Sequence, residues 1–588
     1  MNAQLHLSAL LGIDIGGVNT RTCLFGVSEG KYQALASQSS STSMGHDLHI
    51  GAGVGEAMQA LQQQTGHVFL KDSGGFVMPC KNTGKELDRI AMVISAGPRV
   101  STGILGLSQG GSVKAGKALI DSLPLQSVGA VTSANLRGET SMIKALVKSR
   151  PELLILVGGE DSGAEDPIKH WIEVTRTACC LLPEKAKPVV IFTGNPALES
   201  AVRRRLEPVV QLKVLPNIQP LLGEYDLVPA QSLLEGEILK KWKDSLPGLA
   251  GLHDLTRGLN GIPNRSLDRM LRFLSLAKHQ NPAAQSESGV LAIDLGGKYT
   301  TLSAGLDGRA GTVIQDKFPD LGDTSRMMAA KMIRDWSSED VTLEEADQFL
   351  CNHAVLPGWV PETRRELALS HGFAHFRIRA GLEQLSEYYP WLGYDPQKGL
   401  RAHFEPVIAS GALLTRDPNP GRILLTLLNA LQPWGITTMV LDRFQILPLL
   451  GKIGEAEPVL PVQVLASGAF ENLGTVVSAV GDLPAEKTAV TVRVEMESGK
   501  NYTVDVLQGT LRRLIIPTGE AAVLVFRPDR RVDVGFGGPG LGGRLKVTGG
   551  LVGVVIDARG RPLRLLEPDE DRVARLQGWM RTVGGDHS

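Results

Sequence analysis

Short apolar runs alternate with longer amphipathic segments through much of the first half of the chain. Leu153–Val157 and Val189–Phe192 are uninterrupted apolar runs, and the segment between them, Glu165–Leu182, repeats apolar residues at helical spacing. Apolar runs this short, separated by longer helices, are typical of parallel strands in βαβ units. We therefore predict an α/β region with a parallel sheet at about residues 87–217.

Beyond about residue 450 the pattern changes to alternation of single apolar and polar residues. Val490 and Val492 alternate with polar residues, the chain turns at Ser498-Gly499, and the alternation resumes at Tyr502–Val506. This pattern predicts a half-buried β-hairpin. Further short apolar runs follow, so we predict a β-rich domain at residues 451–588.

One strand–turn–strand pattern occurs twice, as GIDIGGVNTR at Gly12–Arg21 and as AIDLGGKYTT at Ala292–Thr301. In each copy an apolar run ends at an Asp, and one further apolar residue precedes a Gly-Gly pair. The Asp carboxylate is expected to face whatever occupies the turn, while the glycines let the backbone approach a ligand closely. Successive backbone N–H groups beside hydroxyl side chains form a site for an anion. A single turn of this kind closes many hairpins that bind nothing, but two copies favour two loops that bind one polyphosphate from opposite sides.

The paired Asp-x-Gly-Gly hairpins resemble the two phosphate loops of the superfamily that unites actin, sugar kinases and heat-shock chaperone ATPases (ASKHA). The wider sequence resembles one branch of it, the GlmL/MutL family encoded beside adenosylcobalamin-dependent glutamate mutase, which is unrelated to the mismatch-repair protein of the same name. The best-matching pieces, besides the two loops, are Leu154–Asp161, Val190–Asn195 and Gly549–Pro562, and the last is the most specific.

This resemblance implies an α/β, actin-like ATPase fold built from two related halves. The first half is expected at residues 1–285 with the α/β region inserted in it, and the second half at residues 286–450. The β-rich domain at residues 451–588 would follow them.

The resemblance also implies ATP and Mg²⁺ as ligands. Asp14 and Asp294 are the expected catalytic and metal-binding carboxylates, since Mg²⁺ prefers oxygen ligands. In the superfamily the first carboxylate contacts the metal through water, and the second lies near the metal and the attacking water. Donors to the phosphates are expected from both loops: Gly16, Gly17, Asn19 and Thr20 on one side, and Gly296, Gly297, Thr300 and Thr301 on the other.

Three positions depart from the superfamily pattern. Arg21 stands where a phosphate-contacting Lys is common, and it keeps the positive charge. The second loop reads Lys298-Tyr299-Thr300-Thr301 in place of small-Thr-Thr-Asp, which makes it more positive and leaves slow or absent hydrolysis open. Adenosine is expected to rest on Ser410, Gly411 and Ala412, where the methyl group of Ala412 replaces a second glycine and crowds the approach.

Members of the resembled family are thought to be accessory ATPases, or reactivases, of adenosylcobalamin-dependent mutases. By analogy with diol dehydratase reactivases, such a protein would bind mutase subunits that carry damaged cobalamin and use ATP to open them for cofactor exchange. A metabolite kinase and a nucleotide-binding scaffold without hydrolysis remain alternatives. An ATP-driven activator with an iron–sulfur cluster is disfavoured, because the cysteines lack the spacing that a cluster requires.

Composition and charge exclude several other classes. The 588 residues carry a formal net charge of −1, with no basic region suited to nucleic acid or to an anionic membrane. We find no apolar stretch long enough to span a membrane, and Met1–Leu11 lacks the basic start of a signal peptide, so we expect a cytoplasmic protein.

Three further features of the sequence suggest no additional site. The five cysteines, Cys23, Cys80, Cys179, Cys180 and Cys351, contain no C-x-x-C pair and are expected to be reduced. His371 and His375 stand four residues apart, but no third ligand is near, so packed histidines are favoured over a metal pair. The glycine-rich stretch Gly535–Gly550 lacks the spacing of a P-loop and is predicted to be a loop.

Overall fold

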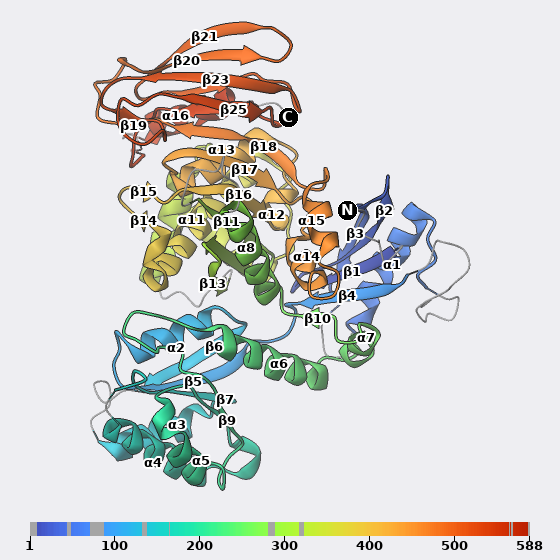
Figure 1. Cartoon of the computed structure of the whole chain (residues 1–588), viewed down its shortest axis with the longest axis vertical. Helices are drawn as coiled ribbons and strands as arrows, with labels where there is room; N and C mark the ends of the chain where they lie inside the picture. Colours follow the sequence, from blue (N-terminus) through green and yellow to red (C-terminus); the bar gives the residue numbers. More distant parts are fainter. Residues whose placement is uncertain are drawn as a thin grey trace. The chain divides into compact units, whose positions relative to one another are not determined.

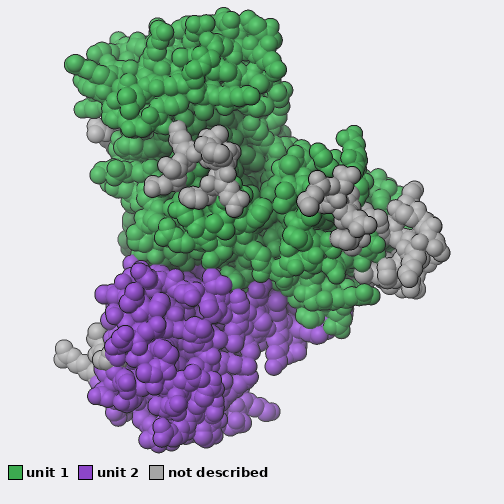
Figure 2. All heavy atoms as spheres, viewed as in Figure 1, with its two compact units in different colours: residues 1–94, 252–588 green, residues 95–251 purple. Residues whose placement is uncertain are grey.

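The computed structural model describes residues 9–43, 49–70, 87–131, 138–163, 165–279, 288–316, 323–563, 565 and 569–585. The chain forms two compact units, one made of Met1–Ile94 with Leu252–Ser588 and the other of Ser95–Gly251 (Figure 2). Cys80 lies outside the described residues. Within the part of the chain that is described, no helix has both the length and the hydrophobicity needed to cross a membrane.

The first repeated motif lies in a five-stranded sheet of the larger unit. Its strand order is β10-β4-β1-β2-β3, in which β1, β2 and β3 are antiparallel neighbours while β4 and β10 run parallel to β1. The strands are β1 (Ala9–Ile15), β2 (Asn19–Ser28), β3 (Lys31–Ser41), β4 (Arg89–Ile94) and β10 (Asn260–Gly261). Helix α1 (Gly51–Thr65) packs on this sheet through buried residues such as Val54 and Met58.

The second motif lies in a sheet that repeats this arrangement. Its first five strands have the order β13-β12-β11-β16-β17, again three antiparallel strands followed by two parallel ones. They are β11 (Gly289–Leu295), β12 (Tyr299–Leu306), β13 (Arg309–Asp316), β16 (Phe404–Ser410) and β17 (Gly435–Leu441). Two sheets with one topology, each carrying one Asp-x-Gly-Gly turn, confirm the predicted actin-like fold of two related halves.

Two helices join the halves through a shared core. Helix α8 (Pro263–His279) crosses α14 (Leu447–Ile453) so closely that a Cβ on Gly451 would lie 2.0 Å from the carbonyl oxygen of Ser266. One buried cluster contains Val93, Leu271, Val290 and Leu449, which come from strands of both halves and from both helices. In Figure 1, α14 and α15 (Val459–Leu465), in orange, lie against the blue strands of the first half.

The C-terminal strands continue the sheet of the second half. Strands β18 (Glu471–Ser478), β26 (Val554–Asp557) and β22 (Leu511–Leu514) extend it beyond β17 to eight strands. A four-stranded sheet, β21-β20-β23-β25, packs on this extension, and the two share a core that includes Val477, Val492, Leu524 and Ile556. Its strands are β20 (Thr488–Met496), β21 (Asn501–Leu507), β23 (Ala521–Pro528) and β25 (Arg544–Thr548).

Two details of this region differ from the sequence prediction. The predicted domain boundary at residue 451 falls inside α14, and β18 belongs to the sheet of the second half because it pairs with β17. The glycine-rich stretch is not a loop throughout, since β25 lies within it and pairs with β23. Helix α16 (Asp569–Thr582) returns to the second half, where Arg572 Nη1 donates to the carbonyl oxygens of Arg334 and Asp335 at 2.8 and 2.9 Å.

The smaller unit is a parallel sheet with the strand order β6-β5-β7-β8-β9, as expected from its short apolar runs. Its strands are β5 (Val100–Gly106), β6 (Leu125–Val131), β7 (Leu153–Val157), β8 (Val189–Phe192) and β9 (Leu212–Val214). Its helices are α2 (Ser112–Asp121), α3 (Glu139–Ser149), α4 (Asp166–Cys180), α5 (Glu199–Leu206) and α6 (Val228–Ser245).

The limits of this unit, 95–251, differ at both ends from the predicted 87–217. At the first end, β4 pairs with β1 and so belongs to the sheet of the first half. At the second end, α6 belongs to the smaller unit because Trp242 Nε1 donates to the carbonyl oxygen of Pro98 at 2.8 Å.

Candidate functional site

The two Gly-Gly turns meet tip to tip. A Cβ on Gly17 would lie 2.6 Å from Cδ of Lys298, and a Cβ on Gly297 would lie 2.6 Å from Cγ2 of Val18. Gly17 therefore faces Lys298, and Gly297 faces Val18, so the contacts of the two turns mirror each other. Only glycine fits at either position while the turns stay in contact, so the repeat in the sequence becomes a near-symmetric pair of loops in space.

A carboxylate from each half lies behind these turns. Asp14 and Arg21 are paired across β1 and β2, and Arg21 Nη1 lies 3.5 Å from Oδ2 of Asp14. Burial raises the pKa of Asp14 to about 6, although Arg21 opposes this shift. Burial likewise raises the pKa of Asp294 to about 7, with Arg21 opposing the shift and Asp14 and Asp442 adding to it.

One oxygen of Asp294 has no hydrogen-bond partner among the described residues. Its Oδ1 atom is buried and accepts no hydrogen bond from any described residue. Leaving a charged acceptor buried and unsatisfied costs free energy, so this atom is suited to contact a bound cation. Among the described residues, no three or more His, Cys, Asp or Glu side chains are grouped so as to hold a metal ion. Mg²⁺ is commonly held by one or two carboxylates together with substrate phosphates, and Asp14 and Asp294 fit that arrangement.

The threonines of the two motifs are engaged within the protein. Thr20 Oγ1 lies 2.9 Å from Oγ1 of Thr42, and Thr300 Oγ1 accepts a hydrogen bond from Arg377 Nε at 3.4 Å. Thr301 Oγ1 accepts one from Asn264 Nδ2 at 3.3 Å. Because side chains alternate along a strand, Thr20 and Arg21 point to opposite faces of the first hairpin. The hydroxyl of Thr42, which contacts that of Thr20, donates to the carbonyl oxygen of Gly16 at 2.8 Å, so both hydroxyls lie beside the first turn.

The segment expected to hold adenosine follows β16. Ser410 ends this strand and is paired in register with Asp294. Gly411 has a φ of 92°, and a Cβ on it would lie 2.4 Å from the backbone of Leu295. The packing of α12 (Ala412–Thr415) on the end of β11 is therefore sufficient to require this glycine. Ala412 is 9% exposed and lines a cavity.

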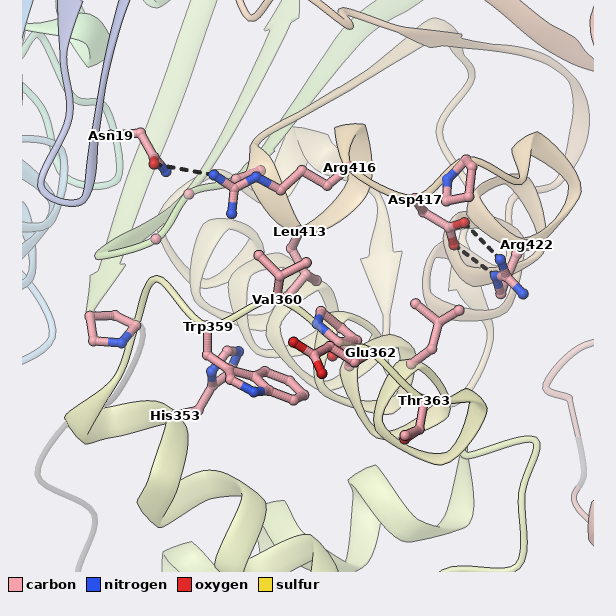
Figure 3. A pocket seen from close by; sticks show the side chains of 18 of the residues that line it. Asn19, His353, Trp359, Val360, Glu362, Thr363, Leu413, Arg416, Asp417 and Arg422 are labelled. Carbon is pink, nitrogen blue, oxygen red and sulfur yellow. Dashed lines mark hydrogen bonds and ion pairs between the residues drawn. The ribbon is translucent and has the colours of Figure 1, made fainter. Parts of the chain in front are cut away.

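This cavity has a volume of about 280 Å³ and joins the turns to the Ala412 segment. Loop residues Asn19, Gly296 and Gly297 line one side of it, and Trp359 lies in the connection between α10 (Leu343–Val355) and α11 (Arg364–Tyr388). Its further lining includes His353, Pro357, Glu362, Thr363, Leu413, Arg416, Asp417 and Arg422 (Figure 3). Ligand pockets typically measure roughly 300–1,000 Å³, so this one is just below that range.

Arg416, which lines the cavity, connects the two halves. Its Nη2 donates to Oδ1 of Asn19 at 3.2 Å, as the dashed line in Figure 3 marks. Burial lowers the pKa of Arg416, and the nearby charge of Arg21 lowers it further. A Cβ on Gly358 would also lie 3.1 Å from Cγ1 of Val18. We call this set of contacts the loop bridge: Val18 against Gly297 and Gly358, Gly17 against Lys298, and Asn19 with Arg416.

One wall of the cavity is an ion pair backed by a histidine. Arg422 donates to both oxygens of Asp417 at 2.8 and 2.9 Å, and His371 Nε2 lies 2.6 Å from Oδ2 of Asp417. Burial raises the pKa of Asp417, but the hydrogen bonds from His371 and Arg422 outweigh it and hold the pKa below its usual range. His375 stacks on Trp336 with ring centroids 4.0 Å apart. Both histidines are packed, buried side chains, as expected from the sequence.

Most of the cavity lining was not predicted from the sequence, including Arg416, Trp359, Asp417 and Arg422. They follow no motif shared with the two turns, and they reach the cavity through packing between distant segments. The nearest signal is position, since Arg416 and Asp417 follow closely after the Ser410–Ala412 segment that the sequence predicts to hold adenosine.

Comparison with known proteins matches the sequence to a family. The family model described as "MutL protein" matches residues 10–468. No curated protein matches the sequence. Among solved structures, gluconate kinase from Lactobacillus acidophilus has 10% sequence identity and a TM-score of 0.26, over 78% of this chain and 91% of that chain.

Two further solved structures are similar at the same low level. Xylulose kinase from Bifidobacterium adolescentis has 11% identity and a TM-score of 0.25, over 75% of this chain and 91% of that chain. A glycerol dehydratase reactivase has 10% identity and a TM-score of 0.19, over 58% of this chain and 76% of that chain. At these values the neighbours add nothing to what the sheet topology already shows.

Proposed function

Because the chain belongs to the MutL protein family, we propose that it is an ATP-binding accessory protein of an adenosylcobalamin-dependent mutase, such as glutamate mutase. The observation that carries the nucleotide-binding part is the meeting of the two Asp-x-Gly-Gly turns beside a cavity. The unpaired Oδ1 of Asp294 lies behind the turns, and Ala412 lines the cavity.

The polyphosphate would lie between the two turns, with the backbone N–H groups of Gly16, Gly17, Gly296 and Gly297 as its donors. Asp14 and Asp294 would hold Mg²⁺, which offsets the negative charge of the phosphates when it is bound. Arg21 would favour the ionised form of the two carboxylates, because its charge opposes the rise in pKa that burial causes at both.

The nucleoside would enter the cavity between Trp359 and Ala412. An aromatic face and a small aliphatic side chain are suited to a planar base, and Glu362 and Thr363 supply polar atoms on the same lining. Since the loop bridge keeps the turns in contact, we infer that a nucleotide must separate Gly17 from Lys298, and Gly297 from Val18, as it binds.

Hydrolysis coupled to partner remodelling is the second part of the proposal. Contacts of the γ-phosphate with both turns would favour one arrangement of the halves, and release of the phosphate after hydrolysis would favour another. Helices α8 and α14, which cross at Gly451, would carry this change through the core that they share with both halves. The smaller unit and the C-terminal sheets are the proposed surfaces for mutase subunits.

A nucleotide-binding scaffold without hydrolysis is the second candidate. One observation favours it: Thr301, which stands where the superfamily has an Asp, is hydrogen-bonded to Asn264. That position therefore supplies no carboxylate near Asp294.

A binding assay followed by a release assay tests the proposal. ATP with Mg²⁺ should raise the melting temperature, since a ligand that binds the folded state stabilises it by about 2.7 kcal/mol at a hundredfold excess over Kd. Purified mutase subunits should then bind the protein and dissociate when ATP is added. If ATP stabilises the protein but the subunits never bind, the nucleotide part stands and the mutase part fails.

A further inference from the structure

One face of helix α11 lines the cavity. Thr363, Leu367 and Ser370 belong to this lining, and they follow one another by four and three residues, which places them on one side of the helix. Thr363 is the exposed N-cap residue, Leu367 is partly buried, and Ser370 is only 3% exposed. The face therefore becomes more buried from Thr363 to Ser370.

The hydroxyl of Ser370 makes no hydrogen bond with any described residue. Its Oγ atom is buried and lacks a partner among them. A serine inside a helix often donates to the carbonyl oxygen four residues earlier, which here belongs to Glu366, but Ser370 does not. A buried polar group without a partner destabilises a folded protein, so this hydroxyl is suited to contact a ligand in the cavity.

Two polar side chains that pack beside this part of α11 are satisfied within the protein. Ser337 packs against α11 and donates to the carbonyl oxygen of Ile333 at 2.8 Å. Asp417, on the cavity wall, lies 2.6 Å from Nε2 of His371, the residue after Ser370. Packing around α11 therefore supplies partners to buried polar groups, and the missing partner of Ser370 is particular to the face that lines the cavity.

The two turns line a different part of the cavity. Asn19, Gly296 and Gly297 come from the turns, where the polyphosphate is proposed to lie, whereas Ser370 comes from α11. The nucleoside, which is proposed to enter the cavity, is therefore the part of the ligand that reaches Ser370. A Ser hydroxyl has one hydrogen to donate, and a purine base carries acceptor nitrogens on its edge.

We propose that Ser370 is a specificity-determining residue of the nucleotide site, whose hydroxyl donates to a nitrogen of the base. This inference rests on the proposed function, because it names a base contact in the same site. The bond forms only in the complex, since the hydroxyl has no partner among the described residues. Ser370 therefore lowers the stability of the free protein and raises its affinity for a nucleotide.

The test compares ATP with inorganic triphosphate in the full-length protein. Inorganic triphosphate has the phosphate chain of ATP but no base, so it can bind between the turns without reaching Ser370. For wild type and for Ser370→Ala, calorimetry gives the Kd of each ligand in excess Mg²⁺. Loss of one neutral hydrogen bond should raise the Kd for ATP about two- to tenfold in Ser370→Ala, and the Kd for triphosphate should stay unchanged.

Melting temperatures separate this role from a structural one. Ser370→Ala removes an unsatisfied hydroxyl, so the free variant should melt at or above the wild-type temperature. The control Ser337→Ala removes the donor of a buried hydrogen bond, so it should melt at a lower temperature but bind both ligands as wild type does. Ser370→Cys, which has a similar size but a weak donor, replaces Ser370→Ala if that variant does not fold.

The outcomes are distinct. An unchanged Kd for ATP in the Ser370 variant overturns the inference and leaves the proposed function intact. An equal loss of affinity for ATP and for triphosphate does the same, because it places the effect of Ser370 on the phosphates or on the fold. If wild type binds no ATP, the proposed function fails, and this inference fails with it.

Discussion

Replacing Val18 by Ala should tighten nucleotide binding. Val18 holds the loop bridge from the side of the first half, where its two methyl groups contact Gly297 and Gly358. A nucleotide between the turns must break these contacts, so they compete with binding. When the competent state is only partly populated, the apparent Kd equals the intrinsic Kd divided by that population.

The size of the effect follows from the two methyl groups that the substitution removes from the loop bridge. A buried methylene group contributes about 0.8 kcal/mol, so two methyl groups would contribute about 1.6 kcal/mol if both were fully buried. Val18 is only partly buried, which reduces the figure to about 1 kcal/mol. We therefore expect Val18→Ala to lower the apparent Kd for ATP with Mg²⁺ about fivefold.

The assay is calorimetric titration of ATP in excess Mg²⁺ into wild type, Val18→Ala and the control Val27→Ala. Val27 is also in the first half, but its side chain is 38% exposed and is not part of the loop bridge. The control should bind ATP as wild type does. An unchanged or weaker affinity of Val18→Ala would refute the reasoning that contact between the turns opposes nucleotide entry.

Three further predictions concern the switch, the joining helices and acid sensitivity. Asp294→Asn should still bind mutase subunits but fail to release them on adding ATP, as measured by surface binding, whereas ATP-driven release at the wild-type rate would argue against a switch. Gly451→Ala should destabilise the protein by about 1–3 kcal/mol, because its Cβ would collide with the Ser266 carbonyl. The control Gly468→Ala, which has open space around the added methyl group, should leave stability unchanged. Equal melting curves for the two variants would contradict the prediction. Burial holds the pKa of His375 well below 6.5, so the unfolded chain binds its proton more readily and stability falls as the pH drops below 6.5. In His375→Phe, the free energy of unfolding should fall less on acidification than in wild type, by up to about 1.4 kcal/mol per pH unit in denaturant titrations. The same dependence of stability on pH in both proteins would disprove this role of His375.

Local sequence predicted the parts of the site that are encoded locally. The Asp-x-Gly-Gly turns could be located because a short strand, two glycines and a second strand are sufficient to define a hairpin. The parallel sheet of the smaller unit followed from short apolar runs in the same way. The alternation of strand side chains could also have shown that Thr20 faces away from Arg21, since the two are consecutive residues of β2.

Long-range packing set the features that the sequence did not reveal. The need for a glycine at Gly411 arises from the backbone of Leu295, more than a hundred residues earlier, and not from a ligand contact visible in the pattern. Arg416 reaches Asn19 across the two halves. The smaller unit begins at residue 95 and not at about 87, because β4 pairs with β1. No local pattern around Arg89–Ile94 could specify that pairing.

The central claim is that two turns from two related halves bind one nucleotide together with Mg²⁺. Calorimetric titration of ATP in excess Mg²⁺ into wild type, Asp14→Asn and Asp294→Asn tests it most directly, with circular dichroism to verify folding. The account predicts one ATP per wild-type chain, and a large loss of affinity in each variant although both remain folded. Absence of binding to wild type, or wild-type affinity in both folded variants, would contradict it.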